Sequence, residues 1–206
     1  MIVIFDRQHY GKPGSSSGDR GAGVDLDGDG QVESAEQEAN LTPLYIDPAR
    51  ELLSQLGHTV YLLDSGWYSQ RHEQAVSIAR DHLGERVAYL ACHINAGGGD
   101  YAVTLYDSRS SGGAALAGSV ADAIAADADL SCLGRSLVRS ASATNDWSNA
   151  YNTIKGIYTG PANISGVCLE PYFLDQTAHR WLTTPEGGSA LAAALVDGIV
   201  RWGRRA

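Results

Sequence analysis

Short apolar runs that alternate with helical stretches are the strongest constraint on how this chain of 206 residues can fold. The apolar runs predict buried strands over 1–5, 58–64, 86–94, 101–107 and 164–170. Apolar residues at helical spacing predict helices over 47–57, 70–84, 112–128 and 189–203. Strands that alternate with helices indicate one α/β domain over 1–206, with a mostly parallel, twisted sheet of about five or six strands flanked by helices.

The helix over 47–57 has the clearest predicted boundaries. Asp47 suits the N-cap, Pro48 suits the first helical position, and Gly57 suits the end. We therefore expect this helix to begin at Asp47 and Pro48.

Polar side chains stand where three of the predicted strands end. The first strand runs into Asp6 and His9, the third runs into His93 and Asn95, and the last ends on Glu170. Ligands gather outside the carboxyl ends of strands in open α/β sheets. The sequence therefore predicts a site built from these strand ends.

The segment "DLDGDGQVESAE" (25–36) matches the EF-hand calcium loop at every ligand position. Carboxylates on alternate residues of a curling backbone converge on one point, Gly30 allows the sharp turn, and Glu36 can close the shell with both oxygens. The predicted calcium ligands are Asp25, Asp27, Asp29, the Gln31 carbonyl and Glu36. An acidic surface turn is the alternative interpretation.

This loop is predicted to be a structural insertion rather than a sensor. The segment 11–23 has the composition of a flexible loop and makes a poor entering helix. We expect an insertion at about 11–40, with at most an exiting helix, that pins the chain and does not open a groove.

The formal net charge of −9 argues against a nucleic-acid partner, because phosphate binding needs a basic surface. No apolar run is long enough to span a membrane, and no basic segment precedes the first strand. We expect a protein made in the cytoplasm without a signal peptide, with no membrane anchor, and monomeric.

Several segments in a fixed order resemble one known family. They are "IVIFDRQHYG" (2–11), "HINAGGG" (93–99), "LEPYFLDQ" (169–176) and "LAAALVDGIVRWG" (191–203). Over nearly the whole chain, this order resembles the zinc-dependent N-acetylmuramoyl-L-alanine amidases of the amidase-3 type. The motif "HINAGGG" is close to the family's H-x-N-A and "LEPYFLDQ" to its E-x-G-F. The opening departs from the family's D-P-G-H-G-G, because Arg7, Gln8 and Tyr10 replace small residues.

The resemblance implies a zinc ion held by His9, one glutamate and His93, with Glu170 beside it as the acid/base residue. Asn95 would support the site or its loop. Three protein ligands and an open position are typical of catalytic zinc.

Two spacings compete for the zinc-binding glutamate. Counting back from Gly57, Glu38 suits the family's usual helix length, whereas Glu36 has the family's usual spacing to Leu41. Residues two apart on a helix point to nearly opposite sides. We therefore expect Glu36 to face calcium and Glu38 to face zinc, with Glu36 as the alternative zinc ligand.

The remaining histidines and the tryptophans are predicted to be structural. The histidines are His58, His72, His82 and His179. The tryptophans Trp67, Trp147, Trp181 and Trp202 are expected in the core, and the alternative is that they line a glycan groove. The segment "TNDWSNAYN" (144–152) is polar and aromatic, and it could shape a substrate cleft.

The resemblance implies hydrolysis of the amide bond between N-acetylmuramic acid and L-alanine in peptidoglycan. Without a signal peptide or a separate cell-wall-binding domain, a phage endolysin released through a holin pore is the first expectation, and an autolysin acting after mother-cell lysis is the second. A calcium-dependent wall-binding module without activity and a zinc peptidase acting within the stem peptide are the alternatives.

Overall fold

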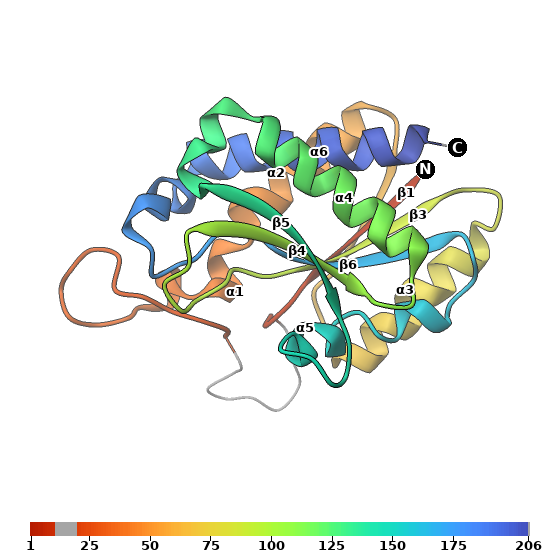
Figure 1. The fold of residues 1–206 in the computed structure, drawn as a ribbon, viewed down its shortest axis with the longest axis horizontal. Helices are drawn as coiled ribbons and strands as arrows, with labels where there is room; N and C mark the ends of the chain where they lie inside the picture. The colour runs from red at the N-terminus through yellow and green to blue at the C-terminus, as the bar shows by residue number, and fades with distance from the viewer. Residues whose placement is uncertain (11–19, 206) are drawn as a thin grey trace.

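Six strands form one sheet with helices on both faces in the computed structural model, which describes residues 1–10 and 20–205 (Figure 1). The sheet order is β2-β1-β3-β6-β4-β5. The strands are β1 (Ile2–Arg7), β2 (Thr59–Leu63), β3 (Val87–Cys92), β4 (Tyr101–Asp107), β5 (Arg135–Ala141) and β6 (Ile164–Glu170). Neighbouring strands are parallel except β4 and β6, which are antiparallel. The predicted α/β class and mostly parallel sheet are confirmed.

The helices divide between the two faces of the sheet (Figure 1). They are α1 (Glu38–Leu41), α2 (Pro43–Gln55), α3 (Tyr68–Asp81), α4 (Ser111–Ala126), α5 (Ser148–Asn152) and α6 (Pro185–Arg204). Short 3-10 turns are η1 (Ser34–Glu36), η2 (Ala128–Leu133), η3 (Ile157–Thr159) and η4 (Thr177–Thr183). Helices α2, α4 and α6 pack on one face, and α3 and α5 pack on the other.

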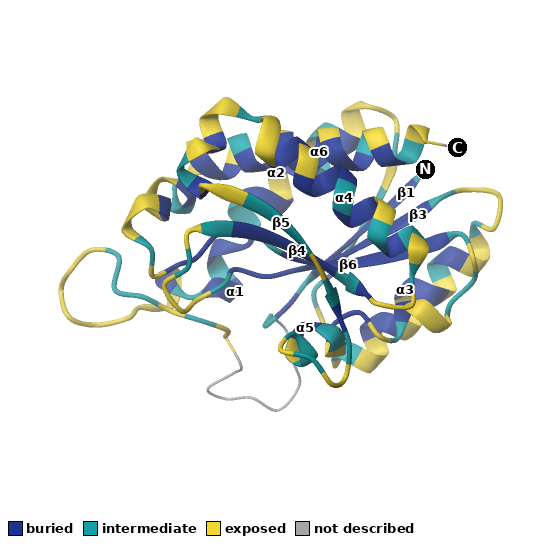
Figure 2. Ribbon diagram, viewed as in Figure 1, coloured by how far each residue is buried: buried dark blue, intermediate teal, exposed yellow. Residues whose placement is uncertain are grey.

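Alternation along the strands gives each face its own hydrophobic core. In β1, Val3 and Phe5 face the α2–α4–α6 layer, whereas Ile2 and Ile4 face the α3–α5 layer. Strands buried on both faces read as continuous apolar runs, which is why the sequence located β1, β3 and β6. Figure 2 shows these central strands buried and the loop around 27–35 exposed.

Most predicted bounds shift by a few residues, and two differences from the predictions have a clear cause in the sequence. Strand β5 was not predicted, because "RSLVRSA" forms a partly exposed edge of the sheet and lacks an apolar run. Helix α2 begins at Pro43, so the predicted start at Asp47 and Pro48 is wrong. Pro43 takes the first helical position instead, and Pro48 lies inside the helix.

The tryptophans do not all lie in the core. Trp202 is fully buried and Trp147 is partly buried, as predicted. Trp67 and Trp181 are exposed, so their predicted burial is wrong. Trp67 is the N-cap of α3, and Trp181 lies within the short turn η4.

None of the helices in the described ranges combines the length and the apolar character needed to cross a bilayer. Residues 11–19 of the predicted insertion lie outside the described residues.

Close backbone contact between α2 and α6 depends on Gly188. Pro48 cannot donate to the Leu44 carbonyl four residues earlier, and Gly188 packs against that same carbonyl. A Cβ on Gly188 would lie 2.4 Å from the Leu44 oxygen, whereas nothing lies within 4 Å of a Cβ on Gly118 in α4.

We therefore expect Gly188→Ala to lower the free energy of unfolding by about 1–3 kcal/mol, as overpacking does. Gly118→Ala is the matched control and is expected to raise it by up to about 1 kcal/mol, since alanine favours helix. Urea denaturation monitored by circular dichroism measures both. Equal stabilities of the two variants would contradict the packing argument.

Candidate functional site

His9 follows β1 and reaches the site from a left-handed backbone. Its φ is 59°, and it is the one non-glycine residue with positive φ in the described ranges. Its Nε2 lies 3.1 Å from Nδ1 of His93, which follows directly after β3. Because β1 and β3 are parallel neighbours, both histidines stand at the same edge of the sheet.

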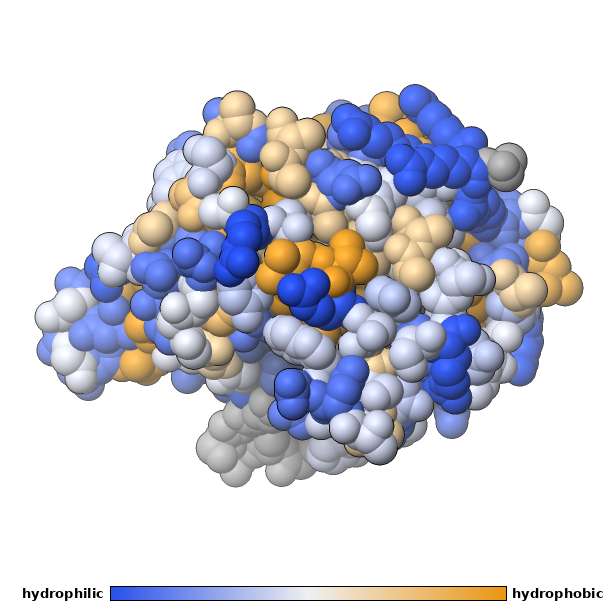
Figure 3. All heavy atoms as spheres, in the orientation of Figure 1, coloured by the Kyte–Doolittle hydropathy of each residue, from blue (hydrophilic) through white to orange (hydrophobic). Residues whose placement is uncertain are grey.

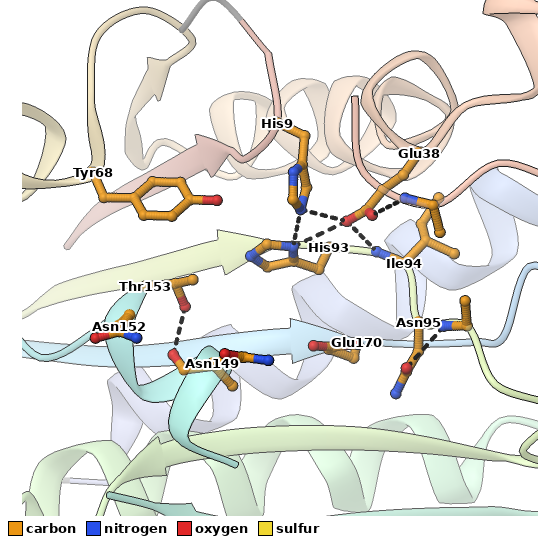
Figure 4. A pocket seen from close by; sticks show the side chains of 13 residues that line it. His9, Glu38, Tyr68, His93, Ile94, Asn95, Asn149, Asn152, Thr153 and Glu170 are labelled. Atoms are coloured by element: carbon orange, nitrogen blue, oxygen red, sulfur yellow. Dashed lines mark hydrogen bonds and ion pairs between the residues drawn. The ribbon is translucent and has the colours of Figure 1, made fainter. Parts of the chain in front are cut away.

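Glu38 is delivered to these histidines by α1, which lies outside the sheet (Figure 4). Its Oε1 lies 2.9 Å from His93 Nδ1 and 3.5 Å from His9 Nε2. Glu38 is 3% exposed. Its carboxylate accepts two backbone hydrogen bonds, from the Ile94 N–H to Oε1 at 2.9 Å and from the Ala22 N–H to Oε2 at 3.0 Å. The N–H donors fix which oxygen faces the imidazoles.

The donor set fits a divalent transition metal. Four tetrahedral zinc ligands at about 2.0–2.1 Å from the ion lie roughly 3.3 Å from one another. The three donor atoms of His9, Glu38 and His93 are 2.9 to 3.5 Å apart. Two imidazole nitrogens and one carboxylate oxygen are also the donor types of many catalytic zinc sites.

Burial and charge act together on the titration of this cluster. Burial alone would raise the pKa of Glu38, but the hydrogen bond and positive charge of His93 bring that pKa below its ordinary value. Burial alone would lower the pKa of His93, but Glu38 raises it above its ordinary value. The pair therefore favours the charged form of each partner.

Glu170, at the end of β6, lies in the same cavity of about 430 Å³ (Figure 4). Burial raises the pKa of Glu170, nearby Glu38 raises it further, and His93 opposes the shift. A carboxylate with a raised pKa is a better proton acceptor than an exposed one.

The opposite wall of the cavity is polar and uncharged. Asn149, Asn152 and Thr153 contribute to it from α5 and its end, so the last residues of the segment 144–152 line the cavity. Tyr68, at the start of α3, also lines it and was not predicted, since no motif marks that position. Ring nitrogen Nε2 of His93 has no hydrogen-bond partner among the described residues and turns toward this wall (Figure 4).

Asn95 lies at the rim and shapes the loop after β3. Its Oδ1 accepts the Ala96 N–H at 2.8 Å, and its backbone pairs with Tyr172 and Leu174. Asp175 accepts the N–H groups of Gly97 and Gly98 at 2.9 and 3.2 Å. The segments "HINAGGG" and "LEPYFLDQ" therefore lie against each other at the cavity mouth.

Glu36 is placed away from the histidines, in the acidic loop. Its Oε1 accepts the Leu26 N–H at 2.6 Å, and its Oε2 accepts the Glu33 N–H at 2.9 Å. Asp25, Asp27 and Glu36 have oxygens close enough to share one cation, whereas Asp29 groups with Asp27 and Glu33. The Gln31 N–H is bonded to Asp29. Figure 3 shows the projecting lobe that carries this loop as mainly hydrophilic.

The histidines predicted to be structural stay outside the candidate metal groups of the described ranges. The ring nitrogens of His72 and His179 contact the Thr153 carbonyl and the Phe173 N–H. His82 contacts Glu85 at the surface, and His58 is partly buried.

No protein-family model and no curated protein sequence matches this chain. Solved structures share its fold. The N-acetylmuramoyl-L-alanine amidase AmiC2 of Nostoc punctiforme is 18% identical, with a TM-score of 0.69 over 100% of this chain and 98% of that chain. The N-acetylmuramyl-L-alanine amidase Ami1 from Mycobacterium abscessus is 20% identical, with a TM-score of 0.68 over 98% of this chain and 97% of that chain. The catalytic domain of the CD27L endolysin targeting Clostridia Difficile is 15% identical, with a TM-score of 0.62 over 98% of this chain and 97% of that chain. At these identities the likeness establishes the fold.

The Glu38–His93 pair predicts how the metal-free protein responds to pH. Glu38, with a lowered pKa, stabilises the fold above its unfolded value of about 4.5 and loses that contribution as the pH falls. His93, with a raised pKa, stabilises the fold below its unfolded value of about 6.5 and loses that contribution as the pH rises.

The Tm difference between the wild-type protein and Glu38→Gln, measured by calorimetry in a chelator, is therefore expected to be largest between about pH 4.5 and 6.5. It should shrink toward about pH 8 and above, as His93 becomes neutral. A difference that stays constant across this range would show that the two groups are not coupled.

Proposed function

We propose that this protein is a zinc-dependent N-acetylmuramoyl-L-alanine amidase that cleaves the amide bond between N-acetylmuramic acid and L-alanine in peptidoglycan. The observation that carries the proposal is the cluster of His9, Glu38 and His93 beside Glu170 in one cavity. Two further observations support it. Solved amidase structures share this fold. The cluster also lies at the carboxyl ends of the strands, where ligands gather in α/β sheets.

In this proposal His9 Nε2, His93 Nδ1 and Glu38 Oε1 would hold the zinc ion. When bound, zinc supplies Lewis acidity and lowers the pKa of water at the site. The Ile94 and Ala22 N–H groups hold the Glu38 carboxylate in orientation, and the Tyr45 hydroxyl donates to the His93 carbonyl at 2.9 Å. These contacts keep the ligand atoms in place before substrate arrives.

Glu170 is the proposed acid/base residue. Its carboxylate would accept a proton from the attacking water and return it to the nitrogen of the departing L-alanine, so that the peptide leaves as a neutral amine. The raised pKa of Glu170 suits both steps, since the group must first accept and then donate a proton. Asn149 and Asn152 offer amide groups on the facing wall that can hydrogen-bond the amides of the substrate.

The expected partner is therefore peptidoglycan, and the expected setting is the cell wall. An endolysin released through a holin pore is our first proposal for its origin, and the similarity of fold to the CD27L catalytic domain supports it. An autolysin that acts after mother-cell lysis is the second.

The first test is Glu170→Gln, which removes the proton-transferring group and keeps the shape of the side chain. We expect its turnover of purified walls to fall by about 10²–10⁴-fold with zinc content unchanged. Its Tm should stay the same or rise, because the ionised form of a buried carboxyl with a raised pKa opposes folding. Glu186→Gln, at an exposed position in α6, is the matched control and should stay fully active. Loss of wall turbidity gives the rate.

Mass analysis of the released material separates the alternatives. An amidase leaves intact glycan strands and free stem peptides that begin at L-alanine. Cleavage inside the peptide would favour a zinc peptidase, and wall binding without cleavage in added zinc would favour a binding module. Full activity of Glu170→Gln would remove Glu170 from the mechanism.

We further propose that the loop 25–36 binds calcium and stabilises the segment that carries Glu38. The arm before the loop lies directly on that segment: the Glu38 N–H donates to the Ala22 carbonyl at 2.7 Å, and the Ala39 N–H donates to the Arg20 carbonyl at 3.0 Å. A Cβ on Gly21 would lie 2.1 Å from the Glu38 carboxylate, so this approach requires glycine.

Calcium at 100 times its Kd is therefore expected to raise stability by about 2.7 kcal/mol, or about 5–10 °C in Tm for a chain of this length. Activity should rise with Tm, because the arm contacts Glu38. Asp27→Asn should abolish the shift, and exposed Asp122→Asn, in α4, should keep it. Identical melting curves in calcium and in a calcium-selective chelator would refute the calcium role.

A further inference from the structure

The backbone at His9 needs an external restraint. A left-handed conformation costs a residue other than glycine roughly 1–2 kcal/mol. Such a conformation persists only where the surrounding structure determines it. His9 has φ 59° and contributes a ring nitrogen to the candidate metal cluster, so whatever fixes this turn also fixes that nitrogen.

Arg71, in α3, supplies this restraint from inside the protein. It is fully buried, and its Nη1 donates to the Arg7 carbonyl at 2.6 Å. Its Nη2 donates to the Tyr10 carbonyl. These two carbonyls stand on either side of His9 along the chain, so one guanidinium clamps both ends of the strained turn.

Arg71 is itself held rigidly. Its Nη1 pairs with Asp6 Oδ1 at 2.7 Å, and its Nε donates to the Gly66 carbonyl at 3.0 Å. Asp6 is fully buried and also accepts hydrogen bonds from Gln8 and Tyr89. A planar guanidinium can satisfy all of these acceptors at once, whereas a lysine ammonium cannot reach them in the same geometry.

Arg7 ties the same turn to the helix that carries Glu38. Its Nε and Nη2 donate to the Ala39 carbonyl at 3.1 and 2.6 Å, and its guanidinium lies 3.7 Å from the centroid of the Tyr10 ring. Two metal-ligand candidates from separate elements are thus connected through one arginine.

We propose that Arg71 is a positioning residue for the zinc site, acting through His9, and that Arg7 extends this restraint to Glu38. The inference rests on the zinc site of the proposed function. Residues that orient metal ligands contribute about 10–100-fold to metal affinity. The role proposed for Arg71 is therefore measurable as zinc affinity, independently of catalysis.

The test compares Arg71→Lys with Arg80→Lys, a change of the same kind at an exposed position of the same helix. Zinc affinity is measured by competition with a chromophoric chelator, and the visible spectrum of the cobalt-substituted protein reports ligand geometry. We expect the zinc Kd of Arg71→Lys to rise about 10–100-fold with altered cobalt bands. Arg80→Lys should match the wild-type protein in both.

Metal-free Tm separates positioning from a merely structural role. A lower Tm with unchanged zinc Kd and unchanged cobalt bands would overturn the proposal. If circular dichroism shows that Arg71→Lys does not fold, Arg7→Met decides in its place, because Arg7 is only partly buried. A weaker zinc Kd in Arg7→Met supports the proposal, and a wild-type Kd overturns it.

Other outcomes test the proposed function independently of the positioning role. If the wild-type protein takes up no zinc and releases no stem peptides, the zinc amidase proposal is wrong. If the wild-type protein binds zinc and cleaves walls while Arg71→Lys binds equally well, only the positioning role is wrong.

Discussion

The burial of the Glu38 carboxylate against two imidazoles is the interaction on which the rest of the site depends. A carboxylate with almost no exposure is costly unless hydrogen bonds and opposite charge compensate it. Here the compensation comes from three groups at two places in the chain: the Ala22 N–H, and the Ile94 N–H and His93 ring just after β3. The hydrogen bonds of this one carboxylate therefore fix the segment around Ala22, α1 and the end of β3 relative to one another.

The sheet order explains why the remaining groups meet that carboxylate. Strands β1, β3 and β6 are adjacent and parallel, so their carboxyl ends share one edge. His9, His93 and Glu170 follow from those ends, although far apart in sequence. The uncharged wall from α5 faces these strand ends. The titratable histidines and glutamates therefore lie on one side of the cavity and the uncharged hydrogen-bonding groups on the other.

Three residues around His9 differ from the D-P-G-H-G-G pattern that the opening of the chain resembles. The small residues of D-P-G-H-G-G are replaced here by Arg7, Gln8 and Tyr10, and each has a defined contact. Arg7 donates to the Ala39 carbonyl, Gln8 donates to Asp6, and the Tyr10 ring packs against the Arg7 guanidinium. The turn that presents His9 is therefore held both by neighbouring side chains, Arg7 and Gln8, and by Arg71 from α3.

What the sequence determined by itself was the set of buried strands and the polar residues that end them. Apolar periodicity and ligand chemistry are local properties, so β1, β2, β3, β4, β6 and the cavity residues Asn149 and Asn152 could be predicted. Edge strand β5 could not, because partial exposure removes the apolar signal. Likewise, the start of α2 depended on which of two prolines took the first turn.

Only the tertiary structure decided which glutamate joins the histidines and what holds His9. Glu36 and Glu38 are two residues apart, and both spacings were consistent with the sequence. The extended Gln37 between η1 and α1 turns their side chains to different neighbours. Arg71 carried no recognisable motif, because its contacts with Asp6, Arg7 and Tyr10 join positions more than 60 residues apart. Such contacts are set by how α3 packs on the sheet, which no local pattern encodes.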